Sequence, residues 1–323
     1  MDVGHDKGYI FCYYWQMKKN SASVYSESWI YAFAQTFFIP AIRPAFCRSV
    51  PAILFNFFLR QYHAAFLPGR IPVSKVDHKL DEKVPFAPSW VTIYIDFVHF
   101  WIRMLTFFLR RYGRRAYVPI RDFIYSMGRL YIYAAEVYKR NMSTTKRPFY
   151  ISRPRFFVIH MLDPHLMCIP SLHVMVVIHA YLQFTEIAKK LGAENELKEQ
   201  ALEMKQGALA ISQAILFVKQ HSVNCIPAAL YGVTCFCPDL FPREEAEKFT
   251  NLLFSPAPAA NEETGKIRVH PCRAPSTNIP EADQAQIKAH ILSLYYRFLE
   301  EGKTAKEWYK PLLNFLRDLP QVK

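Results

Sequence analysis

The sequence has little glycine and no arrangement of cysteines that would fix a fold by cross-linking. Only 10 of the 323 residues are glycine, and the seven cysteines are odd in number and irregularly spaced. Several lie inside apolar runs, where cysteine behaves as a small hydrophobic residue. Cys235 and Cys237 have no second pair that would complete a tetrahedral zinc site. We therefore expect no disulfide framework, no metal and no cofactor.

Nucleic-acid-binding motifs are also lacking, although the net charge is +13. No zinc-finger, RNA-recognition or basic-zipper pattern occurs. Residues 239–323 are neutral, so residues 1–238 carry the whole basic excess. There the basic residues lie between long apolar runs, which is typical of membrane proteins whose Lys and Arg set the topology and contact anionic lipid. The pattern predicts membrane lipids, and no nucleic acid, as partners.

Charged residues are absent from two long stretches, 164–185 and 220–238. Each is about the length needed to cross a hydrocarbon core of ~30 Å. We therefore expect an all-α fold, a polytopic membrane bundle of about six helical spans. The other candidates are shorter or contain charged residues, which leaves a soluble helical interaction protein as an alternative. They are 28–42, 49–59, 90–109, 116–138 and 206–218.

Charge between the candidate spans predicts their direction. Residues 110–115 contain four arginines in a short link, which places that link in the cytoplasm. The loop at 139–154 then lies outside. The first 20 residues are polar and aromatic, so no cleavable signal peptide is expected. These features predict a multi-pass protein of the cytoplasmic membrane.

The chain changes character after residue 238. A Pro-rich linker is followed by apolar residues at helical spacing, which predicts amphipathic helices. We expect a membrane-embedded domain at 1–238 and a soluble helical tail at 239–323, whose partner the sequence does not identify. The apolar positions are Ile287, Ile291, Leu294, Tyr295 and Phe298, then Trp308, Leu312, Phe315 and Leu319.

Three short motifs follow one another in the first domain. Lys146 lies seven residues before Arg153, which precedes a proline. Next come Pro170-Ser171-Leu172-His173 at the start of an apolar stretch, and then Lys219-Gln220-His221 at the start of another. Cations, a serine beside a helix start and two histidines are residues that can bind and transfer a phosphoryl group.

These motifs resemble those of the type 2 phosphatidic acid phosphatase superfamily. Its signatures are Lys-x6-Arg-Pro, Pro-Ser-Gly-His or Pro-Ser-Leu-His, and Ser-Arg-x5-His-x3-Asp, and in one bacterial branch the third often contains Lys-Gln-His. Order and spacing match from about residue 81 to 232, near half of the chain. Residues 81–86, followed by Trp90, also resemble a segment that precedes a span in that branch.

The resemblance implies a metal-independent phosphatase or phosphotransferase acting on a lipid phosphate, of phosphatidic acid or isoprenoid diphosphate type. His221 would attack phosphorus to form a phosphohistidine, and His173 would protonate the leaving alcohol. Phosphate would bind to Lys146, Arg153, Ser171 and Lys219, on the extracytoplasmic side. His165 is the nearby histidine whose role is least clearly structural.

The sequence departs from the signatures beside His221. Cys225 occupies the position of the aspartate that orients the nucleophile, and Ala214-Ile215 replace the Ser-Arg pair. These departures favour, as the alternative, a degenerate member that binds phosphorylated lipid without turnover. A relative of the vanadate peroxidases is a further possibility, against which the uncharged stretches argue because those relatives are soluble.

Overall fold

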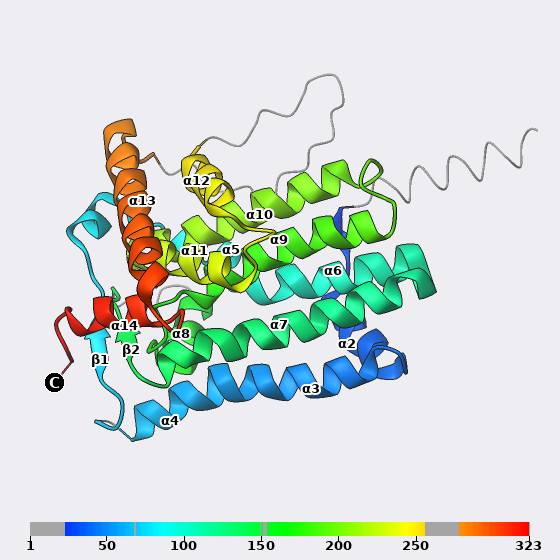
Figure 1. Ribbon diagram of the computed structural model, residues 1–323, viewed down its shortest axis with the longest axis horizontal. Coiled ribbons are helices and arrows are strands. Elements are labelled where there is room, and N and C mark those ends of the chain that lie inside the picture. The colour runs from blue at the N-terminus through cyan, green and yellow to red at the C-terminus, as the bar shows by residue number, and fades with distance from the viewer. Residues whose placement is uncertain (1–22, 68, 149, 151–153, 256–277, 323) are drawn as a thin grey trace, which may run out of the picture.

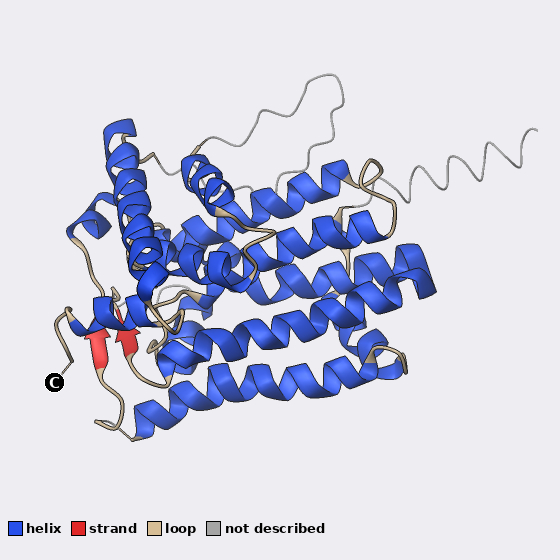
Figure 2. Cartoon of the chain, viewed as in Figure 1, coloured by secondary structure: helices blue, strands red, loops and turns tan. Residues whose placement is uncertain are grey.

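The structure is a computed structural model of residues 1–323 that describes residues 23–67, 69–148, 150, 154–255 and 278–322. It is all-α, with 71% helix and 3% strand, which confirms the all-α part of the predicted fold class. Long helices lie side by side in the main body, and a layer of C-terminal helices covers one end of it (Figures 1 and 2).

The main body is formed by the helices of residues 24–236. They are η1 (Val24–Ser26), α2 (Trp29–Phe38), α3 (Arg43–Leu54), η2 (Phe55–Leu59), α4 (Arg60–Phe66), η3 (Lys79–Lys83), η4 (Pro88–Trp90), α5 (Val91–Ile95), α6 (Phe97–Tyr112), η5 (Gly113–Ala116), α7 (Tyr117–Tyr138), α8 (Pro154–Leu162), α9 (Leu172–Lys190), α10 (Lys198–Phe217) and α11 (Cys225–Phe236). The C-terminal layer contains α12 (Arg243–Leu252), α13 (Glu281–Thr304) and α14 (Lys310–Arg317).

By length and hydropathy, one helical stretch of the described chain, Pro88–Tyr138, qualifies as a membrane span. A turn at Gly113, where φ is +53°, divides that stretch into α6 and α7, which run back beside each other (Figure 1). Such a φ is readily adopted by glycine, which has no Cβ. The bundle of six spans therefore stays a prediction.

The predicted spans and the observed helices differ most at their ends. The uncharged stretch 164–185 is not helical throughout. Its helix, α9, begins only at Leu172, after Ser171. Residues 166–169 instead bond to the main chain and hydroxyl of Ser143. Likewise 220–238 begins with a turn, and α11 starts at Cys225. His221 lies in the turn before α11 and His173 in the first turn of α9, so both motif histidines lie at the same end of the bundle.

Two short parallel strands hold that end together. β1 (Val73–Lys75) pairs with β2 (Met142–Thr144), in the register Val73 to Met142. The C-terminal residues return to β1, where Val322 N donates to Val73 O at 2.7 Å and Lys75 N to Pro320 O at 2.7 Å. The predicted tail 239–323 thus packs directly on the main body, also through α13 on α11 (Figure 1). Most of the predicted linker lies outside the described residues.

The apolar positions predicted for the tail face inward. Ile287, Ile291, Tyr295 and Phe298 on α13 are fully buried, as is Leu312 on α14. Polar contacts secure the interface, because the hydroxyl of Tyr295 lies 2.9 Å from Thr234 Oγ1 on α11. Burial of such side chains contributes roughly 1.5–3 kcal/mol each, which explains why these helices lie against the body.

Candidate functional site

The turn that carries His221 is fixed by the segment around η3. Asp81 Oδ1 accepts from Val223 N at 2.7 Å, and Asp81 Oδ2 accepts from His78 N at 2.7 Å. Lys219 Nζ donates to the carbonyl oxygens of Asp81 and Val84. The ammonium of Lys219, predicted to bind phosphate, is thus engaged with the main chain in this structure.

His173 is held in the first turn of α9 by aromatic packing. Its ring stacks on Tyr94 with centroids 4.6 Å apart and lies 4.1 Å from the ring of Phe97. The neighbouring Ser171 is fully buried, and its hydroxyl has no hydrogen-bond partner among the described residues. The role of Ser171 in phosphate binding stays a prediction, because this residue is not in the lining of the cavity beside His173.

The two motif histidines meet although 48 positions separate them in the chain. His221 Nε2 lies 3.3 Å from His173 Nδ1, and both side chains are largely buried. Burial, and to a smaller extent the nearby His165, lowers the pKa of His221 to about 3. His221 is therefore a neutral imidazole at pH 7.

A small cavity adjoins this pair. Beside His173 and His221, its walls include Asp163, His165 and Cys168 from the loop before α9. Phe57, Gln61, Met167 and Leu172 complete the lining. The cavity therefore holds three imidazoles, a thiol and a carboxylate next to apolar side chains.

The loop before α9 places a second histidine in a different environment. His165 Nδ1 lies 3.8 Å from Asp163 Oδ2, and the Nε2 on the other side of the ring lies 2.9 Å from Thr145 Oγ1 and 3.6 Å from Cys168 Sγ. Burial would lower the pKa of His165, but Cys168 and Asp163 raise it to about 9. The pKa of Asp163 falls to about 2, because His165 outweighs the effect of burial.

Cys225, at the position where the resembled family has aspartate, does not orient His221. Nδ1 of His221 is buried and has no hydrogen-bond partner among the described residues. Cys225 instead hydrogen-bonds to Cys168. The cysteine therefore belongs to the environment of Cys168.

Arg147, which the sequence motif did not single out, contacts both turns beside the cavity. Arg147 Nη1 lies 3.3 Å from Gln220 Oε1 and 3.4 Å from the carbonyl oxygen of Asp163, so it bridges the two turns. Lys146 is exposed, and its main-chain N–H donates to Asp77. Arg153 lies outside the described residues. The assignment of Lys146 and Arg153 to phosphate binding stays a prediction.

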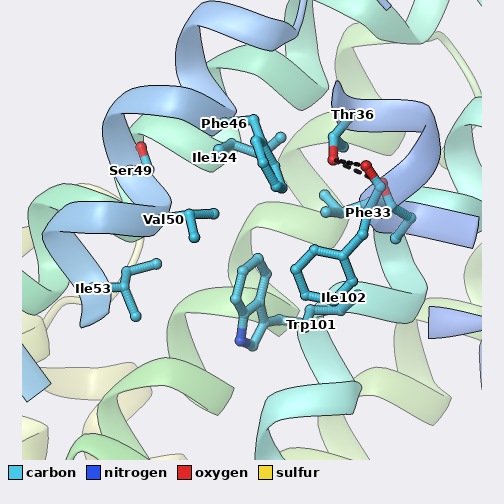
Figure 3. Close-up of a pocket in the computed structure, with 11 residues that line it drawn as sticks. Phe33, Thr36, Phe46, Ser49, Val50, Ile53, Trp101, Ile102 and Ile124 are labelled. Atoms are coloured by element: carbon cyan, nitrogen blue, oxygen red, sulfur yellow. Dashed lines mark hydrogen bonds between the residues drawn. The ribbon is translucent and has the colours of Figure 1, made fainter. Parts of the chain in front are cut away.

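A separate crevice is almost entirely apolar. It lies between α2, α3, α6 and α7 and includes Phe33, Phe46 and Trp101 (Figure 3). Its Thr36 hydroxyl is satisfied by the carbonyl oxygen of Ala32 at 2.7 Å. With no cation in its lining, this crevice is unsuited to a phosphate. Another pocket, between α13 and α14, is polar and includes Arg297, Glu301 and Lys310, but its lining has no histidine or cysteine. The histidine cavity is therefore the candidate for nucleophilic chemistry.

Comparison with known proteins gives no relative. No family model, curated protein or solved structure matches this chain. Among the described residues, no group of three or more His, Cys, Asp or Glu has an arrangement that could hold a metal ion. The cavity is therefore the feature of the molecule from which a function can be inferred.

Proposed function

We propose that the protein is a membrane phosphatase or phosphotransferase that acts on a lipid phosphate, such as phosphatidic acid or an isoprenoid diphosphate. The observation that carries this proposal is the 3.3 Å contact between His221 Nε2 and His173 Nδ1 at a cavity beside Arg147. Imidazoles supply nucleophiles, acids and hydrogen-bond donors, and a guanidinium matches the charge and shape of a phosphate. The three motifs of the resembled family predict this meeting.

Exposed apolar side chains support a membrane location. Of the large hydrophobic residues exposed in the described chain, most lie on α2, α3, η2 and α4, between Trp29 and Leu67. α3, η2 and α4 follow one another from Arg43 to Phe66, which at ~1.5 Å per residue is roughly 36 Å, enough to cross a hydrocarbon core. In water such a surface would be a liability for aggregation, whereas lipid would cover it. We propose this surface as the lipid-facing side of a multi-span bundle.

The distribution of arginines supports an orientation of the bundle in the membrane. α6 begins near His173, through Phe97, and ends at the arginines of 110–115, and α7 returns from there to the cavity end (Figure 1). The basic turn and the cavity therefore lie at opposite ends of the hairpin. With the basic turn in the cytoplasm, the cavity faces the extracytoplasmic side.

Release of inorganic phosphate from lipid phosphates by the purified, full-length chain tests the proposed activity. His173→Ala should reduce turnover by at least about 100-fold, the usual contribution of a positioned acid–base group. His63→Ala, an exposed histidine on α4, is the matched control and should retain activity. Turnover that survives His173→Ala would contradict the assignment of the cavity.

A non-catalytic lipid phosphate receptor is the second candidate. It is favoured by the lack, among the described residues, of a carboxylate bonded to Nδ1 of His221, because removing such a carboxylate from a catalytic histidine strongly reduces turnover. A folded, membrane-integrated chain that binds vesicles containing phosphatidic acid but releases no phosphate from any lipid of the panel would support this candidate over the enzyme.

A further inference from the structure

The loop before α9 folds three reactive groups together within six residues. Asp163 faces Nδ1 of His165 at 3.8 Å and also accepts the main-chain N–H of His165 at 2.9 Å. Nε2 of the same ring lies 3.6 Å from Cys168 Sγ. The order carboxylate, imidazole, thiol is the arrangement in which a base activates a nucleophile while a third group orients the base.

The backbone of this loop is held in an unfavourable conformation. His165 has φ of +59°, in the left-handed region that non-glycine residues seldom adopt. Bonds from the loop to β2 stabilise it, because Ser143 accepts the N–H of Ile169 on its hydroxyl at 2.7 Å and that of Cys168 on its carbonyl at 3.2 Å. The loop is thus constrained to keep His165 against Cys168.

The environment of Cys168 stabilises a thiolate. Burial by itself would raise the pKa of this thiol, but the hydrogen bond from Cys225 and the adjacent His165 lower it to about 6. At pH 7 the pair is then a thiolate beside an imidazolium, the reactive form of a nucleophilic cysteine. His221, at the same cavity, has neither a carboxylate nor another hydrogen-bond partner at Nδ1 within the described chain.

We propose that Cys168, activated by His165 and Asp163, is the nucleophile that takes the phosphoryl group at this cavity. This inference rests on the proposed function and replaces His221 as the covalent residue. His173 and His221 then act as neutral hydrogen-bond donors to the phosphate oxygens, and Arg147 neutralises part of its charge.

The reaction balances with water as the only co-reactant. The Cys168 thiolate attacks phosphorus, and a P–S bond forms as the P–O bond to the lipid breaks. The electron pair leaves on the lipid oxygen, which takes the proton of the His165 imidazolium. Neutral His165 next removes a proton from water as the water oxygen attacks phosphorus, and the electron pair of the P–S bond returns to the thiolate. Lipid alcohol and inorganic phosphate leave, and the starting ion pair is restored.

Trapping of the covalent intermediate locates the nucleophile. The full-length protein is mixed with phosphatidic acid labelled in its phosphate, quenched under mildly alkaline conditions, and digested with trypsin. The label should appear on Cys168 in the peptide 156–189, and Cys168→Ser should abolish it and lower turnover by at least about 1,000-fold. Cys235→Ala, in α11, is the matched control. Label on His221 in the peptide 220–243, with turnover kept in Cys168→Ser, would overturn the inference and leave the proposed function intact.

A second measurement does not depend on turnover. It therefore tests the reactivity of Cys168 even when the protein releases no phosphate and the proposed function fails. The rate of modification of Cys168 by a small neutral thiosulfonate is followed against pH by mass spectrometry. We expect half-maximal reactivity near pH 6, shifted upward by at least about one unit in His165→Gln, which removes the imidazolium beside the thiolate. Cys237, whose pKa burial raises to about 12, is the internal comparison and should still gain reactivity at pH 9. A Cys168 that does not react, or whose reactivity rises only above pH 8, overturns the inference.

Discussion

His165 and His221 line the same cavity but differ in what lies behind their rings. His165 has the Asp163 carboxylate at its Nδ1 and a thiol at its Nε2, whereas Nδ1 of His221 is buried without a hydrogen-bond partner in the described chain. Their pKa values diverge accordingly, to about 9 for His165 and about 3 for His221. Histidines whose surroundings push their pKa values apart can take separate roles in one reaction.

The comparison also explains Cys225. In the resembled family the residue at this position is a carboxylate that serves the motif histidine, but here it is a thiol that bonds to Cys168. With cysteine at this position, Nδ1 of His221 has no carboxylate beside it, whereas Cys168 gains a hydrogen bond from the thiol of Cys225.

The largest effect is expected for His165→Gln. Glutamine keeps a polar, hydrogen-bonding side chain but carries no proton to donate at neutral pH, so turnover should fall by about 1,000-fold or more. His179→Gln is the control, because His179 is equally buried and bonds to Ser126 at 2.8 Å, away from the cavity. Initial rates of phosphate release compare the two. A His165→Gln protein that keeps more than a tenth of the activity would return the catalytic role to His173 and His221.

Arg147→Leu should reduce turnover by about 100-fold, because its guanidinium is the cation that touches both turns at the cavity. Arg147→Lys should restore part of the loss as a point charge without the planar fork. The loss in Lys146→Leu should be smaller than in Arg147→Leu, since Lys146 is exposed. Arg121→Leu, on α7 with a partner in Asp122, controls for the lost charge. Equal losses at 146 and 147 would show that the loop rearranges around the substrate.

The sequence predicted the helices well, because apolar runs and basic links are local signals. It also predicted that His173 and His221 would act together, on the strength of motif order. It missed the contacts that need the tertiary structure. Lys219 matched a motif yet binds the carbonyl oxygens of Asp81 and Val84, and α9 starts late because residues 166–169 pair with Ser143. Asp163, His165 and Cys168 are close in sequence, but only the left-handed φ at His165 reveals that they converge.

The smallest expected effect, a change in activity of about tenfold in Cys225→Asp, discriminates most sharply between His221 and Cys168 as the nucleophile. If His221 is the nucleophile, Cys225→Asp supplies its missing acceptor, and activity should rise. If Cys168 is the nucleophile, a carboxylate beside it replaces a thiol donor and repels the thiolate, so activity should fall about tenfold.

The two mechanisms also differ in their pH dependence. If Cys168 is the nucleophile, the rate rises with pH as its thiolate forms and is half-maximal near pH 6 in the wild type. Cys225→Asp should shift this rise in rate to higher pH, while Cys225→Ser, which keeps a hydrogen-bond donor, should shift it less. Rates of phosphate release between pH 5 and 9 therefore separate the mechanisms, and a gain in Cys225→Asp without a shift of this rise would favour His221.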